Sequence, residues 1–129
     1  MQFAYTLIYV SDVAASLDFY ERAFGLKRRF LHESGAYGEL ETGATALAFV
    51  EHATARDSVG SDYLAAEDSE RPLGMEVGFT TPDVGAAYER ALAAGAVPLK
   101  APTLKPWGQT VAYVRCPDGS LVELCTPMG

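Results

Sequence analysis

The sequence predicts an α+β protein built from two βαβββ modules in tandem. One observation is the order of elements: residues 4–51 are typical of a strand, a helix and three strands, and the same order returns in residues 73–126. The other is a local repeat, since "SDVAAS" at the start of the first helix matches "PDVGAA" at the start of the second, and "YERA" occurs at Tyr20 and at Tyr88. Two copies are too few for a solenoid, so the repeat predicts a paired fold with a cleft inside or between the modules.

The first module opens with a strand over residues 4–10. Its alternation puts Tyr5, Leu7 and Tyr9 on one face and the residues between them on the other. The helix that follows starts at a capping Ser11 or Asp12 and ends at Gly25, and its apolar residues recur at helical spacing: Val13, Leu17, Tyr20 and Phe24. Three strands are expected at residues 26–33, 36–42 and 45–51, with glycine turns between them.

Residues 52–72 are polar and lack strand alternation, so they predict a linker with room for one short helical turn. The second module repeats the first. A strand is expected at residues 73–81, a helix from Pro82 to Gly95, and three strands at residues 96–101, 109–115 and 120–126. The chain is therefore expected to form one domain, with module one at residues 1–51 and module two at residues 73–129.

The composition is that of a globular protein, with 129 residues of which 49% are hydrophobic and 21% charged. The net charge of -7 opposes binding to nucleic acid and to anionic membranes and mildly favours cationic ligands. No apolar run approaches the roughly 18 residues of a membrane span, and no signal peptide is apparent. These features predict a cytoplasmic protein with no nucleic-acid or membrane partner.

The two cysteines, Cys116 and Cys125, flank a "PDG" hairpin turn and fall about four residues out of register on neighbouring strands. At roughly 3.4 Å per residue the separation is too large for a disulfide. Both are expected to be small side chains in a reducing compartment.

Two motifs resemble the vicinal oxygen chelate superfamily, which includes glyoxalases, bleomycin resistance proteins and extradiol dioxygenases. "YVSDVAASLDFYERAFGL" is similar to the superfamily's strand–Asp–helix opening, and "WGQTVAYVRCPDGSLVEL" is similar to its ending, with Cys116 where an Asp is frequent. The resemblance covers nearly the whole chain. It implies that the sheet of each module curls into a cup and that the protein is a homodimer in which cups are completed across modules or chains.

In metal-dependent members the ligands lie on the first and last strands of each module. The motifs place these positions at Tyr5, Phe49, Glu76 and Glu123. Tyrosine is a poor ligand for zinc or iron and phenylalanine is none, while His32 and His52 match no ligand position. The resemblance therefore implies a member without a transition metal; a divalent cation held weakly by Glu76 and Glu123 is the alternative.

Alternation predicts that Met75, Val77 and Phe79 pack on the helix, so that Glu76 faces the cup. By the same pattern Glu123 faces the cup beside Leu121 and Cys125. Two neighbouring carboxylates cannot both ionise cheaply, so they share a proton, bind a cation or meet a hydrogen-bond donor. One hypothesis makes them a seat for a cationic ligand, with Glu123 as a general base. The other makes them inherited carboxylates that a neighbouring hydroxyl satisfies.

Aromatic residues on the predicted cup faces indicate either a ligand pocket or a filled core: Tyr5, Tyr9, Tyr37 and Phe49, with Tyr113 joining them if the hairpin register allows. Trp107, the single tryptophan, lies in the loop "LKPWGQT" before a strand. A loop tryptophan either packs under its loop or stacks on a flat ligand. This stretch resembles the corresponding part of bleomycin resistance proteins, and the resemblance favours ligand contact for Trp107.

The sequence therefore predicts a homodimer that binds an aromatic or amphipathic small molecule, cationic ones included, in an aromatic-lined cup, as in drug or toxin sequestration. The alternative is an enzyme of the same fold. Such an enzyme would be a metal-dependent lyase, isomerase or dioxygenase, or a metal-free enzyme with Glu123 as base.

Overall fold

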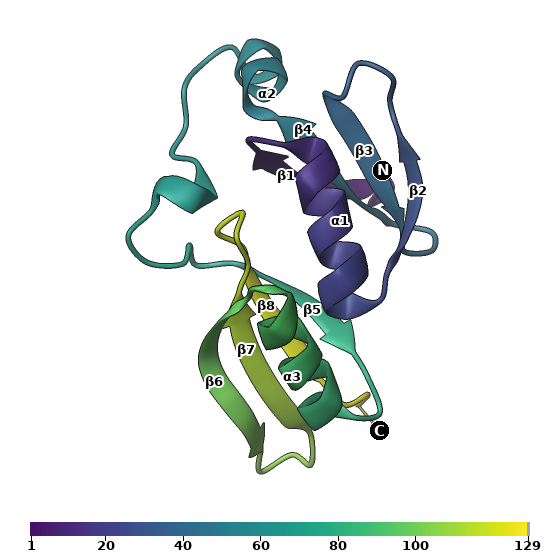
Figure 1. Ribbon diagram of the computed structural model, residues 1–129, viewed down its shortest axis with the longest axis vertical. Helices are drawn as coiled ribbons and strands as arrows, with labels where there is room; N and C mark the ends of the chain where they lie inside the picture. The colour runs from purple at the N-terminus through teal and green to yellow at the C-terminus, as the bar shows by residue number, and fades with distance from the viewer. Residues whose placement is uncertain (129) are drawn as a thin grey trace. The chain divides into compact units, whose positions relative to one another are not determined.

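The computed structural model describes residues 1–128 and confirms the two βαβββ modules (Figure 1). The chain forms two compact units, Met1–Ala65 and the part from Ala66 onward. Each unit has its own four-stranded mixed sheet and its own long helix lying on one face of that sheet. In the part of the chain that the structure describes, no helix is long and apolar enough to cross a membrane.

The first unit has the sheet order β1-β4-β3-β2, in which β1 runs parallel to β4 and the other neighbours are antiparallel. Its elements are β1 (Tyr5–Val10), α1 (Val13–Phe24), β2 (Lys27–Leu31), β3 (Tyr37–Glu41), β4 (Ala46–Glu51) and α2 (His52–Val59). Each predicted strand is present and is shorter than expected by one to three residues.

Helix α1 has the ends that its sequence predicts. The Asp12 carboxylate accepts a hydrogen bond from the Ala15 backbone N–H at 3.0 Å, and Gly25 ends the helix in the left-handed conformation. The predicted apolar stripe is largely buried against the sheet. The packing is close at Gly38, where a Cβ atom would lie 2.7 Å from Leu17 Cδ1, so glycine is what lets helix and strand approach.

The second unit repeats this order as β5-β8-β7-β6, with β5 parallel to β8. Its elements are η1 (Ala66–Asp68), β5 (Glu76–Thr80), α3 (Val84–Ala94), β6 (Val97–Leu104), β7 (Thr110–Arg115) and β8 (Leu121–Cys125). Asp83 caps α3 by accepting from the Ala86 N–H at 3.0 Å, and Gly95 ends it. Pro82 thus precedes the helix instead of opening it.

The predicted linker is more ordered than expected. Its first residues form α2, an eight-residue helix that belongs with the first unit. Tyr63 follows that helix and packs back on it, because the Tyr63 hydroxyl lies 2.6 Å from His52 Nδ1. The 52–72 stretch is therefore divided, with residues up to Ala65 in the first unit and those from Ala66 in the second.

Arg115 holds the start of the second unit on the β7–β8 hairpin. Its guanidinium donates to the carbonyl oxygens of Ala66 and Ser69, both at 2.9 Å, and to that of Gly119 at 3.2 Å. Gly119 has φ 90°, and a Cβ atom there would lie 2.3 Å from the Ala66 carbonyl. Glycine at position 119 therefore allows both the turn conformation and the close approach of residues 66–70.

Both cysteines are free, as predicted, and both are buried. Cys125 is paired in register with Val111, and the Cys116 N–H bonds to the Ser120 carbonyl at the hairpin turn. The two thiols therefore lie at different levels of the sheet.

Candidate functional site

In the first unit, α1 covers the face of the sheet to which Phe49 points. The Phe49 ring lies 4.9 Å from that of Tyr20 on α1, and its side chain is fully buried. The prediction that Phe49 faces the cup is therefore wrong. Alternation along "ALAFVE" was ambiguous because the strand is apolar on both faces, and such a strand gives no period-2 signal.

The opposite face, here called the cup face, carries the predicted tyrosines. Tyr5 and Tyr9 occupy alternate positions of β1, and Tyr37 is paired with Val50 of β4. The cup-face neighbours of Phe49 on β4 are Ala48 and Val50, and neither side chain can coordinate a metal.

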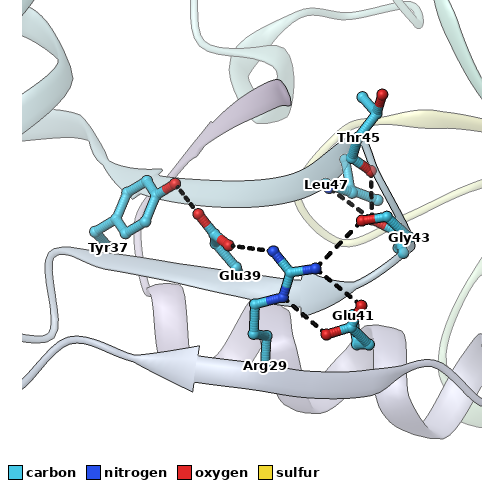
Figure 2. A network of polar contacts seen from close by, with 8 residues as sticks. Arg29, Tyr37, Glu39, Glu41, Gly43, Thr45 and Leu47 are labelled. Atoms are coloured by element: carbon cyan, nitrogen blue, oxygen red, sulfur yellow. Dashed lines mark hydrogen bonds and ion pairs between the residues drawn. The ribbon is translucent and has the colours of Figure 1, made fainter. Parts of the chain in front are cut away.

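A polar network crosses this cup face (Figure 2). Arg29 makes a two-pronged ion pair with Glu41, with Nε–Oε2 and Nη2–Oε1 distances of 2.8 Å, and reaches Glu39 at 3.2 Å. The Tyr37 hydroxyl donates to the other Glu39 oxygen at 2.6 Å. Burial and the Glu39 carboxylate together raise the pKa of Tyr37 to about 12. The hydrogen bonds from Arg29 lower the pKa of Glu41 below its ordinary value.

Tyr63 is the centre of a second cluster of side chains, at the end of β1. Its ring lies 5.0 Å from that of Tyr9, and the Arg56 guanidinium lies 4.6 Å from its centroid. The hydrogen bond to His52 completes the cluster. Neither histidine lies at a predicted ligand position. His52 bonds to Tyr63, and His32 bonds within its own turn to Ser34. Tyr9 is thus covered by a residue of the predicted linker.

In the second unit, the strand register brings the predicted carboxylates onto neighbouring strands. Glu123 on β8 is paired with Gly78 of β5 on one side and with Tyr113 of β7 on the other. Glu76 is two residues before Gly78 on the same face. Burial, and then a hydrogen bond with Glu123 and its charge, raise the pKa of Glu76 above its ordinary value of 4.5. The two carboxyl groups therefore interact, and Glu76 with Glu123 is here called the acid pair.

Two further groups border the acid pair. Burial raises the pKa of Tyr113, and the negative charges of Glu123 and Glu76 add to that rise. Burial and the same two carboxylates also raise the pKa of the Cys125 thiol, so the thiol stays protonated and unreactive. Met75, expected on the helix side, precedes β5 and is 68% exposed. The acid pair thus has a hydroxyl and a thiol as neighbours and can accept a proton or a cation.

Trp107 lies in the turn between β6 and β7. Its side chain is 62% exposed, so it does not pack under its own loop. The indole Nε1–H donates to Gln109 Oε1 at 2.8 Å. Of the two expectations for this residue, burial under the loop is wrong.

The comparisons with known proteins agree on one family. The model of the Glyoxalase/Bleomycin resistance protein/Dioxygenase superfamily matches residues 2–124. The chain belongs to this superfamily. The expected resemblance and the tandem βαβββ fold are confirmed with it.

Named relatives of this superfamily match most of the chain. A lactoylglutathione lyase of Neisseria meningitidis serogroup A is 31% identical over 130 residues, covering 95% of this chain and 88% of the relative. A glyoxalase-related enzyme from Fulvimarina pelagi has a TM-score of 0.82 at 25% identity, covering 98% of this chain and 88% of the other. A superfamily enzyme from Burkholderia phytofirmans has the same TM-score at 22% identity, with 98% of both chains covered, and shows the fold alone.

In this chain, the residues at the ligand positions of metal-dependent superfamily members do not fit a transition metal. The first strand presents Tyr5, the β4 cup face presents Ala48 and Val50, and two carboxylates remain. Within residues 1–128, no three His, Cys, Asp or Glu side chains are grouped so that they could hold a metal ion. The donor set thus lacks the imidazoles and the third carboxylate that such a centre uses.

Three residues that border these sites could not be placed from the sequence alone. Tyr113 joins the cup-face residues only if the hairpin register allows, and the structure pairs it with Glu123. Arg29 gives no sign of its ion pairs in the sequence, because a bulge in β2 shifts the register beside it. Tyr63 carried no signal, since a lone aromatic residue in a polar stretch has no period to place it.

Proposed function

We propose that the protein binds a flat, cationic or amphipathic small molecule, and that this is a binding function without transition-metal chemistry. The observation that carries the proposal is the acid pair, Glu76 with Glu123, on the cup face of the second sheet. A ligand cation relieves the repulsion between two carboxylates that otherwise have to share one proton.

Other features of the chain support the same ligand class. The net charge of -7 favours the approach of cations. Trp107 offers an exposed indole in the same unit, and tryptophan is the aromatic side chain that attracts cations best. In the first unit taken by itself, Tyr5, which is 52% exposed on the cup face, is a separate candidate for ligand contact together with Tyr9 and Tyr37.

We also propose that the protein works as a homodimer. Tyr5, Phe3, Met75 and Leu104 are large apolar side chains that the single chain leaves exposed. Such surface favours association. Light scattering at micromolar concentration is expected to give twice the chain mass, and a monomer at that concentration would contradict this part of the proposal.

The second candidate is an enzyme of the glyoxalase type. It is supported by the 31% identity with lactoylglutathione lyase and by the acid pair, in which burial and Glu123 raise the pKa of Glu76 and Glu123 is the candidate general base. In this candidate, as in the first, Glu123 is the residue on which the function depends.

A thermal-shift screen distinguishes the candidates. Planar dyes of equal ring size with positive, zero and negative charge would be compared, and the cation is expected to raise the melting temperature most. The Glu76→Gln/Glu123→Gln double variant is expected to lose that preference while keeping its fold. Equal shifts for all three charges would contradict a cation site. Lactoylglutathione lyase activity in the purified protein, with metal near one equivalent per chain by elemental analysis, would favour the enzyme.

A further inference from the structure

The indole of Trp107 is exposed and yet held in place. Its turn is closed by the Lys105 N–H bonding to the Gln109 carbonyl at 2.7 Å and by Gly108 N–H bonding to the Lys105 carbonyl at 2.9 Å. The ring itself is held by Gln109, whose side-chain oxygen accepts the Nε1–H at 2.8 Å. An exposed side chain usually keeps its rotamer freedom, and this one has lost a part of it.

Gln109 is itself anchored to the end of the sheet. Its amide Nε2 donates to the Thr126 carbonyl oxygen at 2.8 Å. Thr126 and Thr110 are joined by two further hydrogen bonds of 3.0 Å, one through the Thr126 hydroxyl and one between backbones. The half-buried Gln109 side chain thus uses both ends of its amide, one toward the indole and one toward the strand that carries Glu123 and Cys125.

We propose that Gln109 is the positioning residue for ligand stacking on Trp107. It fixes the plane of the indole before a ligand arrives, and it occupies the only hydrogen-bond donor of the ring. A ligand at this place therefore meets the π faces of the ring and no N–H group. This selects planar rings and cations over ligands that offer a hydrogen-bond acceptor. The stacking of a ligand on Trp107 rests on the proposed binding function. The restraint of the ring by Gln109 does not, because it exists in the free protein.

The restraint can be measured without any ligand, because Trp107 is the single tryptophan. Time-resolved fluorescence anisotropy of the free protein is expected to show little nanosecond motion of the indole. The Gln109→Leu variant keeps the side-chain size and removes both hydrogen bonds, so a fast depolarising component is expected to appear. The matched control is Thr126→Val, which loses the hydroxyl bond to Thr110 while the carbonyl that Gln109 uses remains. Equal anisotropy decays for the wild type and Gln109→Leu would overturn the proposal.

Binding gives the second readout, with 10-methylacridinium as a planar cationic probe that quenches indole fluorescence. Gln109→Leu is expected to weaken its affinity about threefold to tenfold, since the ring must then be ordered on binding. Thr126→Val is expected to bind as the wild type does. A free ring in Gln109→Leu with unchanged affinity would overturn the positioning role. If the wild type does not bind the probe, the proposed function fails for this ligand class, and the anisotropy comparison alone decides whether Gln109 restrains the ring. If Gln109→Leu fails to fold by circular dichroism, Gln109→Ala takes its place in both measurements.

Discussion

Glu76 and Glu123, 47 positions apart in the chain, lie on neighbouring parallel strands, where burial and then the Glu123 carboxyl raise the pKa of Glu76. This relationship exists because β5 pairs with β8 across the whole second module, which places its first strand beside its last. Such a pair is stable while one proton lies between the two groups, and it becomes repulsive when both groups ionise.

The first prediction concerns the pH dependence of stability. The folded protein raises the pKa of Glu76, so the folded state holds a proton that the unfolded chain releases near pH 4.5. The stabilising contribution of protonated Glu76 is therefore complete below pH 4.5 and is lost as the pH rises through the raised pKa. Glu76→Gln keeps a neutral side chain at every pH. We expect this variant to gain stability relative to the wild type as the pH rises from 4 to 8, in urea unfolding measured across that range.

The control for this prediction is Glu89→Gln, on the exposed face of α3 in the same unit. It removes the same charge without touching the acid pair. A pH profile for Glu76→Gln that runs parallel to that of the control would contradict proton sharing between Glu76 and Glu123.

The second prediction tests which face of β4 is the core face. Phe49 is fully buried against Tyr20, and Tyr5 is 52% exposed. Phe49→Ala is expected to cost about 3–5 kcal/mol of unfolding free energy, because it leaves a cavity beneath α1. Tyr5→Ala is expected to cost about 1 kcal/mol or less. Urea unfolding monitored by circular dichroism measures both, and similar losses for the two variants would mean that Phe49 faces the cup after all.

The third prediction separates the two roles of Gly119. Gly119 and Gly43 have the same φ of 90°, but a Cβ atom at Gly43 has nothing within 4 Å, whereas at Gly119 it would strike the Ala66 backbone at 2.3 Å. Gly43→Ala is expected to cost about 1–2 kcal/mol for the left-handed conformation alone. Gly119→Ala is expected to cost about 1–3 kcal/mol more, because the backbone of residues 66–70 must move away.

Limited proteolysis reports the place of that movement. In Gly119→Ala, and also in Arg115→Met, which removes the guanidinium, cleavage within residues 66–72 is expected to become faster than in the wild type. Gly43→Ala should leave it unchanged. Equal cleavage in Gly119→Ala and Gly43→Ala would show that the hairpin does not hold this segment.

The fold was predictable because both modules give regular signals. The capping residue Asp12 and the terminating glycines Gly25 and Gly95 are local features, and each one agrees with the structure. The second helix is capped by Asp83, one residue after the predicted start at Pro82. The repeat of the βαβββ order then predicted that the two modules have the same topology. The linker was harder, because its order comes from contacts distant in sequence, such as those of Arg115 with residues 66–70.

The candidate site was only partly predictable, for the same physical reason. The faces of Glu76 and Glu123 followed from alternation in half-buried strands. The face of Phe49 did not, since β4 is apolar on both sides and its neighbours decide which side α1 covers. The position of Gln109 depends on the turn at residues 105–108, and a turn of that kind is not fixed by residue type alone. The position of Tyr113 beside Glu123 depends instead on the register of the β7–β8 hairpin.

The last prediction concerns Trp107. The ring is 62% exposed and makes one side-chain hydrogen bond, so its removal opens no cavity. Trp107→Ala is therefore expected to cost about 1 kcal/mol or less in unfolding free energy, whereas a core tryptophan would cost about 3 kcal/mol or more. Ligand affinity is expected to fall about tenfold or more, since stacking on an indole contributes on the order of 1 kcal/mol beyond the area buried, and about 1.4 kcal/mol is one decade. Isothermal titration calorimetry of the best compound from the charge-matched screen measures this change, with Trp107→Phe as the variant that keeps a ring. A strongly destabilised Trp107→Ala with unchanged affinity would mean that the indole supports the fold and has no part in binding.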